Sequence, residues 1–425
     1  MSQNFPKWPL WLSLGAYLVL TAALIVAVPL GASPDEAAHW QYVEHIAQTG
    51  TLPVFRATSV SDPGYEFHQP PLYYLICAPL WKLLGTGVQN YACRVVSLLC
   101  GLGTIALIWS AARLLFSSNL RIAGAAAGVA AFLPLHQGVG AGSNNDALGG
   151  LICATLFFLM ARFMVNGVTR RDVWQVGVVA GLGILTKNTA LSVAIVALGA
   201  LFWAARRENS SVSSPTALAM AFGLALLLGG PWLARNISLY GDPLVQTAFK
   251  AAFPPMGISE FAQGGIGLVS YLRGFLWVAF GTTWGFFGGP NSLLEATRPL
   301  APSGPRVPQL ALAPLMALCA LFPLACALGW RRIDALDDAQ KTTLRVWSIG
   351  ILFVLLAWAQ FAAQYFAGAQ ARYGHAALLP LCVLLAAGWV ALWRSGRSLV
   401  LASLVVGASL ILLTLLNVFG WKTLV

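Results

Sequence analysis

The sequence predicts an all-α membrane protein, a single bundle of about eleven transmembrane helices. Of its 425 residues, 58% are apolar and only 9% are charged, whereas soluble proteins carry about 25% charged residues. Eleven stretches approach the roughly 20 apolar residues that a helix needs to cross a bilayer. No repeat, low-complexity tract or soluble domain interrupts them, so we expect one integral membrane domain over residues 1–425.

The predicted spans are separated by short connections, apart from two longer segments. They are 9–30, 91–115, 121–141, 146–165, 172–187, 189–205, 215–235, 308–330, 345–366, 374–393 and 398–420. The fifth and sixth spans are short and share a hairpin at Lys187-Asn188. The first span lacks a signal cleavage site and should remain as an anchor. The seven cysteines lie singly within apolar stretches of the sequence, without the spacing of metal ligands, and are interpreted as core residues.

The basic residues predict the orientation in the membrane. With the N-terminus in the cytoplasm, more than half of the 25 Lys and Arg residues lie at short cytoplasmic connections, as the positive-inside rule requires. Topology thus explains the net charge of +11, and no nucleic-acid partner is expected. The longer segments 31–90 and 236–307 become the first and second extracytoplasmic loops of a multi-pass inner (plasma) membrane protein. Within the second, 267–288 should lie on the outer surface or re-enter.

The first outer loop concentrates the titratable residues. It contains five of the fourteen acidic residues and three of the five histidines, namely Asp35, Glu36, Glu44, Asp62, Glu66, His39, His45 and His68. The sequence Ser33-Pro34-Asp35-Glu36 predicts the start of a surface helix, with Ser33 as the N-cap and Glu36 completing a capping box. The helix should end at Gly50, with Asp35, His39 and Tyr42 on one face.

Two interpretations of this acidic pair remain open. The helix dipole alone favours acidic residues at an N-terminus, so capping explains Glu36 as well as a functional role does. Asp35 points more strongly to function, because a charge held just beneath the lipid headgroups is costly unless it is paired or used.

A second interfacial helix is predicted from the Phe67–Tyr74 segment, FHQPPLYY, to about Leu84. Its two prolines fix the start, and Tyr73, Tyr74 and Trp81 fit an interfacial aromatic belt. Glu66 and His68 lie just ahead of this N-terminus, a position where helices bind anions.

Several motifs together resemble the polyprenyl-phosphate-sugar-dependent GT-C glycosyltransferases, a superfamily that includes protein O-mannosyltransferases and lipid A aminoarabinose transferases. They are Asp-Glu after the first span, PPLYY, SNNDAL (143–148), GLGILTKNTAL (181–191), PWLARNISLYGDPL (231–244), WGFFG (284–288) and QARYGHAALLPL (370–381). They occur in the family's order over nearly the whole chain. The resemblance implies a GT-C-like bundle and an inverting transfer of sugar from a polyprenyl-phosphate donor at the extracytoplasmic face.

The resemblance also implies roles for particular residues. Asp35 would be the general base on the acceptor hydroxyl, grouped with Glu36 and His39 as catalytic. Substrate-binding residues would be His68, Gln69, Tyr73, Asp146, Lys187, Arg372 and Tyr373. Chemistry agrees, since such a transfer needs one base and cationic groups on the leaving phosphate. Arg372 and Lys187 are the phosphate candidates, although Lys187 could instead snorkel, as we expect of Arg235 and Arg273.

One motif departs from the family. Aminoarabinose transferases have Phe-Glu-Lys-Pro-Pro where this chain has Phe67-His68-Gln69-Pro70-Pro71, which weakens the aminoarabinose interpretation. Asp35, Glu36, His39 and His68 could jointly hold a divalent cation, although no spacing demands one. No other cofactor is predicted.

Three further polar residues have structural interpretations. His136 could staple a hairpin to the Asn144–Asp146 turn or contact substrate. His375 is interpreted as a satisfied helix histidine rather than a donor-pocket residue, and Asp242 as a turn residue.

The acceptor could be a lipid, a glycan or a protein, and the lack of a large soluble domain favours the first two. The alternative function is a transporter or flippase of lipid-linked sugars, which would need charges deep in the bundle and repeated or broken helices. A non-catalytic membrane scaffold is a third class, disfavoured by the cluster of Asp35, His39 and His68.

Overall fold

The computed structural model describes residues 7–59, 62–285, 309–333, 335–393 and 395–422. Over these residues the chain is helical, and the only strand-like pairing is an isolated bridge between Met256 and Tyr365. The helices are α1 Trp8–Ala27, α2 Glu36–Thr49, η1 Tyr65–His68, α3 Leu72–Leu84, α4 Tyr91–Leu115, α5 Leu120–Phe132, α6 Pro134–Ala141, α7 Asn145–Asn166, α8 Arg170–Ile184, α9 Asn188–Ala204, α10 Ser214–Tyr240, α11 Gln246–Ala252, α12 Ile258–Gln263, α13 Leu268–Trp284, α15 Gln309–Trp330, α16 Asp338–Gln364, η2 Phe366–Ala369, η3 Ala371–Ala377, α17 Leu378–Leu392 and α18 Gly396–Lys422.

The predicted all-α membrane architecture is confirmed, but the number of spans is not. Among the described residues, 8 helices are long and apolar enough to cross a membrane, or up to 9 if one bent pair is a single span. Helices α8 and α9 occupy the predicted positions with only 15 and 17 residues, less than a bilayer requires of a straight helix. The protein is a multi-pass membrane protein.

The bent pair is α5 and α6, predicted as one span over 121–141. The two helices meet at 55°. Leu133 has an extended backbone, and Pro134 opens α6. A proline disfavours helical geometry in the residue before it, so the break is encoded in the sequence.

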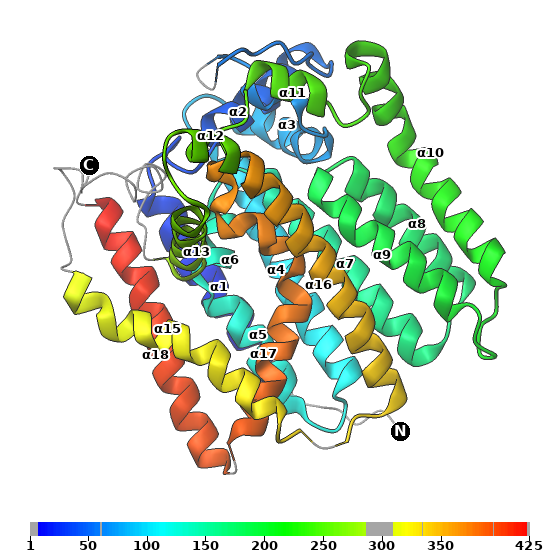
Figure 1. The fold of residues 1–425 in the computed structure, drawn as a ribbon, viewed down its shortest axis with the longest axis vertical. Coiled ribbons are helices and arrows are strands. Elements are labelled where there is room, and N and C mark those ends of the chain that lie inside the picture. Colours follow the sequence, from blue (N-terminus) through cyan, green and yellow to red (C-terminus); the bar gives the residue numbers. More distant parts are fainter. Residues whose placement is uncertain (1–6, 60–61, 286–308, 334, 394, 423–425) are drawn as a thin grey trace.

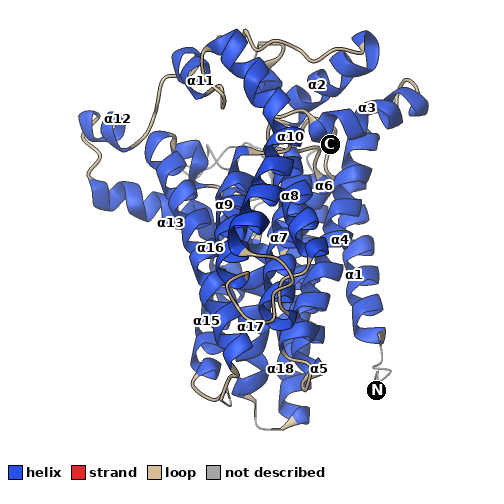
Figure 2. Ribbon diagram, turned by 90° about the vertical axis from the view of Figure 1, so that its right-hand side faces the viewer, coloured by secondary structure: helices blue, strands red, loops and turns tan. Residues whose placement is uncertain are grey.

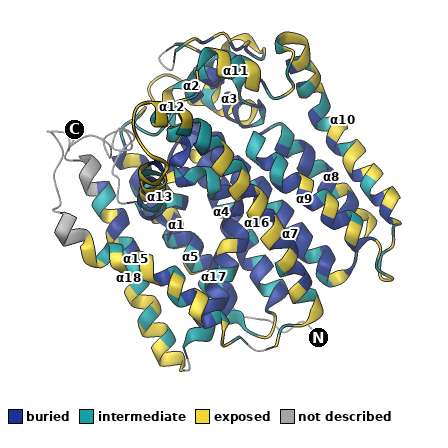
Figure 3. Cartoon of the chain, viewed as in Figure 1, coloured by how far each residue is buried: buried dark blue, intermediate teal, exposed yellow. Residues whose placement is uncertain are grey.

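The long helices pack into one bundle, with α4, α7 and α17 near its middle and α10 and α18 at its edges (Figure 1). Helices α4, α7 and α17 are largely buried, and α7 packs against α4, α8, α9 and α16. Outer helices such as α10, α15, α16 and α18 expose large apolar side chains along one face (Figure 3). Because such exposed apolar surface is rare on soluble monomers, these faces are suited to lipid. All seven cysteines are free and buried.

The short helices of both long connections gather at one end of the bundle. Helices α2, α3, α11 and α12 lie at this end, and the α15–α16 and α17–α18 connections lie at the opposite one (Figure 2). Helix α13, predicted as part of a surface or re-entrant segment 267–288, packs against α6, η2 and η3. Residues 286–288, and with them most of the WGFFG motif, lie outside the described residues, as do residues 286–307 of the predicted second outer loop.

The predicted capping box at the start of α2 is wrong. The helix begins at Glu36, and the residue before it, Asp35, is left-handed (φ 61°) and makes no side-chain cap. Glu36 instead forms an ion pair with Arg94 of α4 at 2.7 Å, and both side chains have 0% exposure. Capping does not explain Glu36, because its carboxylate points into the protein.

Every polar atom of this pair is satisfied. Arg94 donates from Nε and Nη2 to Glu36, and from Nη1 and Nη2 to the carbonyls of Ile25, Val28 and Pro29. The remaining acceptor positions of Glu36 receive the backbone N–H groups of Gly31, at 2.9 Å, and Ser143, at 3.0 Å. Arg94 thus supplies all five of its donors. The pair joins the end of α1, the start of α2, the start of α4 and the loop before α7.

Replacement of Arg94 with Met should therefore destabilise the protein strongly. Removal of one partner from a buried ion pair leaves the other charge uncompensated, at a loss of about 3–5 kcal/mol. We expect the free energy of unfolding of the purified protein to fall by this amount. Arg273→Met, at an exposed position of α13, is the control. Tolerance of Arg94→Met would contradict the role given to the pair.

Candidate active site

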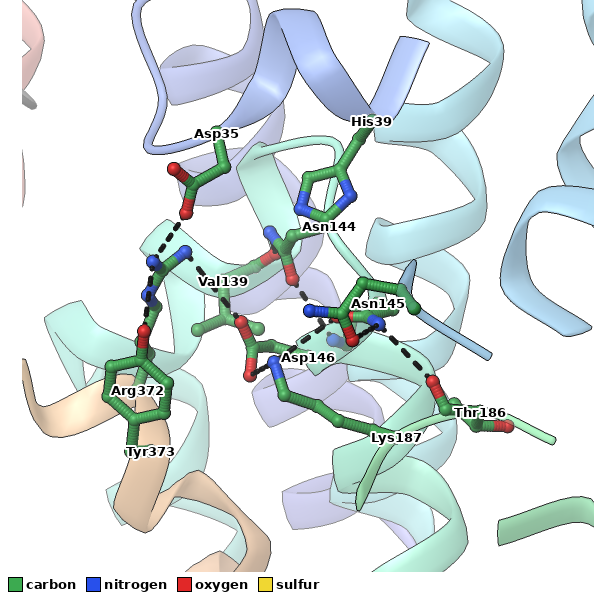
Figure 4. Close-up of polar contacts among 12 residues, drawn as sticks. Asp35, His39, Val139, Asn144, Asn145, Asp146, Thr186, Lys187, Arg372 and Tyr373 are labelled. Atoms are coloured by element: carbon green, nitrogen blue, oxygen red, sulfur yellow. Dashed lines mark hydrogen bonds and ion pairs between the residues drawn. The ribbon is translucent and has the colours of Figure 1, made fainter. Parts of the chain in front are cut away.

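The residues that the sequence singles out come from four separate segments. Asp35 and His39 lie at the start of α2, Asp146 at the start of α7, Lys187 in the α8–α9 turn, and Arg372 in η3 (Figure 4). The four segments meet at the end of the bundle where α2 and α3 lie, and their charged groups face one another.

Asp35 is held in a strained conformation against Arg372. Its left-handed backbone costs a residue with a Cβ about 1–2 kcal/mol, and such strain often marks functional sites. The Oδ2 atom accepts a hydrogen bond from Nη2 of Arg372 at 2.6 Å, and the two side chains are 30% and 15% exposed. The carboxylate is therefore both paired and accessible.

A second ion pair lies beside the first. Lys187 Nζ forms an ion pair with Oδ1 of Asp146 and donates to Oδ1 of Asn145 at 3.2 Å. The other oxygen of Asp146 lies 3.9 Å from Nη1 of Arg372. Asp146 thus stands between two cations, and the ring of Tyr373 lies 5.8 Å from Lys187 Nζ and 5.3 Å from the Arg372 guanidinium carbon.

Backbone contacts place Lys187 next to the start of α3. The N–H of Leu72 donates to the carbonyl of Leu185 at 2.8 Å. Asn145 donates from Nδ2 to the carbonyl of Thr186, at 3.2 Å, and to Oε1 of Gln69, at 3.1 Å. Because the first N–H groups of a helix have no acceptor within that helix, the bond from Leu72 ties α3 to the α8–α9 turn, and the bond from Asn145 holds Gln69 within the cluster.

His68 is oriented by two hydrogen bonds. The amide nitrogen of Gln69 can only donate, so Nε2 of His68 accepts from it at 3.1 Å, and Nδ1 then donates to the carbonyl of Tyr65 at 2.9 Å. The ring packs against Phe55 and Phe249, whose centroids lie 5.3 and 4.7 Å away. Burial lowers the pKa of His68 to about 4, so the ring is neutral at pH 7.

The acidic groups at this end of the bundle have opposite pKa shifts. Burial alone would raise the pKa of Asp35, but the charge of Arg372 and its hydrogen bond hold that pKa below its usual range. Burial lowers the pKa of His39 and raises the pKa of the Glu66 carboxyl. Asp35 therefore stays ionised beside the guanidinium of Arg372, and Asp146 is likewise paired with cations.

Two of the predicted site residues do not reach the cluster. Glu36 is committed to Arg94, as described above. Tyr73 turns to α4, where its hydroxyl donates to the carbonyl of Cys93 at 3.0 Å and lies 2.9 Å from Ser97 Oγ. The hydroxyl at the site is that of Tyr74, 2.9 Å from Nδ1 of His39. The successive residues of a helix face different directions, and Tyr74 rather than Tyr73 faces α2.

The proposed divalent-cation set does not assemble. Over the described residues, no three or more His, Cys, Asp or Glu side chains converge in a way that could hold a metal ion. Glu36, one of the four candidate ligands, faces Arg94 instead.

The remaining polar residues have the following places. Asp242 accepts from the N–H groups of Leu244 and Thr247 and is a turn residue, as expected. Arg235 donates to the carbonyls of Leu52 and Pro53. His136 does not face the Asn144–Asp146 turn, because its Nδ1 lies 3.0 Å from Nε2 of His375.

Sequence reasoning missed Arg94 and Asn145. Arg94 is a charged residue inside an otherwise apolar span, which by itself predicts a buried partner. The partner, Glu36, lies 58 residues away in the chain, and no local pattern connects the two. Asn145 was noted only as part of a motif, although its amide contacts two other segments of the site, at Gln69 and at Thr186-Lys187.

Comparison with known proteins bears on the fold. Residues 68–234 match the family model of dolichyl-phosphate-mannose-protein mannosyltransferase. ArnT from Cupriavidus metallidurans, solved with bound undecaprenyl phosphate, superposes with a TM-score of 0.57 at 14% identity, over 99% of this chain and 77% of that chain. The chain has the GT-C fold.

Archaeal oligosaccharyltransferases have this GT-C fold as well. The apo enzyme from Archaeoglobus fulgidus gives a TM-score of 0.56 at 14% identity, over 99% of this chain. AglB from the same organism, in complex with an inhibitory peptide and a dolichol-phosphate, gives 0.53 at 14% identity, over 97% of this chain. The chain described here spans only 57% and 56% of those chains. No curated protein matches it. The resemblance predicted from the motifs is confirmed.

The Asp146–Lys187 pair gives a testable stability prediction. Lys187→Met leaves the buried Asp146 carboxylate with only the more distant Arg372, so the free energy of unfolding should fall by several kcal/mol. Asp146→Asn in the same chain removes the unpaired charge. We expect the double variant to be more stable than Lys187→Met alone, as measured by denaturation in detergent. A double variant as unstable as the sum of the single changes would show that the two residues are not a pair.

Proposed function

We propose that this protein is an inverting glycosyltransferase that moves a sugar from a polyprenyl-phosphate donor to an acceptor hydroxyl on the extracytoplasmic face of the inner membrane. The observation that supports this most is the Asp35–Arg372 pair, at 2.6 Å. It combines an ionised carboxylate with a guanidinium in a site of low exposure. Inverting transfer requires these two groups, a base for the nucleophile and a cation for the leaving phosphate.

The proposed reaction is a single displacement. Asp35 accepts the proton of the acceptor hydroxyl while that oxygen attacks the anomeric carbon of the sugar. The bond between the anomeric carbon and the phosphate oxygen breaks, and its electron pair leaves with the polyprenyl phosphate. Arg372 and Lys187 stabilise the negative charge that develops on the leaving oxygen.

The charge balance of the site suggests how donor and base are coupled. Both cations are already paired, Arg372 with Asp35 and Lys187 with Asp146. A donor phosphate that binds Arg372 must therefore compete with the Asp35 carboxylate. Once displaced, Asp35 is free to accept a proton from the acceptor. Asp146, which faces both cations, would hold them in place throughout.

The residues around the site bear on where the substrates would bind and on which side of the membrane they would lie. His68, Gln69 and Tyr373 line the polar surroundings of the cations, where the phosphate and the sugar would lie. The loops 31–90 and 236–307 would both be extracytoplasmic, and the acceptor would be a lipid or small glycan rather than a folded protein. The sugar could be a hexose or a pentose.

A transporter or flippase of lipid-linked sugars is the second candidate. The observation that favours it is the broken helix pair α5–α6, since broken helices line many transport sites. The two functions differ in their need for a base, and the replacement of Asp35 separates them.

Asp35→Asn should abolish sugar transfer while it leaves the protein folded. Loss of a general base lowers kcat by about 10²–10⁴-fold. The measurement is transfer from a polyprenyl-phosphate sugar by purified protein in nanodiscs, with thermal unfolding as the check on folding. Glu44→Gln, the same chemical change further along α2, is the matched control. Full activity of Asp35→Asn would rule out the mechanism proposed here.

The pH dependence of transfer should follow the ionisation of Asp35. The base is active when deprotonated, so activity is present above its pKa and is lost as the pH falls through it. Because Arg372 lowers that pKa, Arg372→Gln should shift the acidic limb of the kcat/KM profile to higher pH, apart from any loss of affinity. An acidic limb that does not move in Arg372→Gln would mean that another group is the base.

A further inference from the structure

A column of three stacked rings lies below the site, inside the bundle. Tyr17 of α1 stacks on His136 of α6, with ring centroids 4.8 Å apart, and His136 stacks on His375 of η3 at 5.2 Å. The interplanar angles are 28° and 23°. All three side chains are at most 3% exposed. The column therefore connects the first helix of the chain to the segment that carries Arg372.

The hydrogen bonds of the column fix the proton positions. The carbonyl of Gly101 can only accept, so His136 donates from Nε2, 3.3 Å away. Nδ1 of the neutral ring must then accept from Nε2 of His375 at 3.0 Å. Tyr17 in turn donates to the carbonyl of His136 at 3.3 Å. A hydrogen bond joins the two histidine rings directly, and the Tyr17 hydroxyl is bonded to the backbone of His136, so the column is a directional contact as well as a packed one.

Glycines of three helices make the space for these rings. A Cβ on Gly101 of α4 or on Gly140 of α6 would lie 1.9 or 2.0 Å from the Tyr17 hydroxyl. A Cβ on Gly150 of α7 would lie 2.4 Å from Nδ1 and Cε1 of His375. Real Cβ contacts are not this short, so the rings fit only because these positions lack side chains.

The space beside Gly150 that the His375 ring fills, called the Gly150 slot from here on, lies one helical turn below the charged site. Asp146 and Gly150 are four residues apart and lie on one face of α7. Arg372 and His375 are three residues apart in η3, and a 3₁₀-helix has three residues per turn, so their side chains also share one edge. Asp146 faces Arg372 at 3.9 Å, and one turn deeper Gly150 receives the His375 ring. Helix η3 is thereby docked on α7 at two points.

We infer that His375, seated in the Gly150 slot and hydrogen-bonded to His136, is a positioning residue that sets the depth and rotation of Arg372 relative to Asp35. The other end of the column, Tyr17, belongs to the helix whose C-terminal carbonyls bind Arg94 and lead to Asp35. Inside the bundle, the column therefore connects the helix that leads to Asp35 with the segment that carries Arg372. The inference rests on the proposed function for its effect on transfer, but not for its effect on the Asp35–Arg372 contact.

The test is Gly150→Ala in the full-length protein, alone and combined with His375→Ala. Gly128→Ala is the matched control, because a Cβ at this apolar position meets nothing within 4 Å. A displacement of about 1 Å at a catalytic group lowers rates on the order of 10²-fold, so Gly150→Ala should lower kcat/KM to this extent. It should also shift the acidic limb of the kcat/KM profile to higher pH, as loss of the Arg372 charge would. His375→Gln, which can still donate to His136, should retain most of the activity.

The combination of changes separates positioning from a general packing defect. In the His375→Ala background, Gly150→Ala should have no further effect, because the ring that it displaces is gone. Lower activity with an unmoved acidic limb, or additive losses in the double variant, would overturn the inference.

A second measurement does not depend on enzyme activity. A double-mutant cycle of Asp35→Asn and Arg372→Gln, followed by thermal unfolding, gives the coupling between the two side chains. We expect Gly150→Ala to reduce this coupling by at least about half and Gly128→Ala to leave it unchanged. A wild-type protein that transfers no sugar would refute the proposed function alone, whereas an unchanged coupling in Gly150→Ala would refute the positioning role alone.

Discussion

The buried pair between Glu36 and Arg94 is the contact on which the site depends. It joins the C-terminal carbonyls of α1, the first residue of α2 and the backbone N–H of Ser143 before α7. The base candidate Asp35 directly precedes Glu36, and the site residues Asn145 and Asp146 closely follow Ser143. A pair with two fully desolvated charges is rarely favourable in itself. Its value here is that it fixes two segments of the site to one point, including the left-handed backbone at Asp35.

Above this anchor, the site is a balanced set of charges. Two carboxylates and two cations face one another, with Asp146 between Lys187 and Arg372. Without a bound anion, each carboxylate stays paired with a cation. A phosphate that enters the site must displace a carboxylate from its partner. In the mechanism proposed here, that displacement links donor binding to release of the base, so the base is unpaired only when a donor is present.

The sequence predicted the membrane bundle and most of the side chains that meet at the end where α2 and α3 lie, and the errors have physical causes. Apolar runs identified every described long helix, because a helix that crosses a bilayer needs a continuous stretch of apolar residues, which can be recognised from local sequence alone. For Glu36, the Ser-x-x-Glu pattern predicts capping and the family resemblance implies a catalytic role, whereas its partner in the structure, Arg94, is distant in sequence. Tyr73 was preferred over Tyr74 because the motif does not reveal which of two adjacent tyrosines faces α2. The stacking of His136 on His375, 239 residues apart, likewise follows from tertiary packing alone. The number of spans was the least predictable feature, because helices such as α8 and α9 are close to the minimum length that crosses a bilayer.

The central claim is that the Asp35 carboxylate and the donor phosphate compete for Arg372. Binding of polyprenyl phosphate to purified protein in nanodiscs, measured for wild type, Asp35→Asn and Arg372→Gln, tests it most directly. The account predicts that Asp35→Asn binds polyprenyl phosphate more tightly than wild type, since the competing charge is gone, and that Arg372→Gln binds it more weakly. Equal or weaker binding by Asp35→Asn would contradict the account.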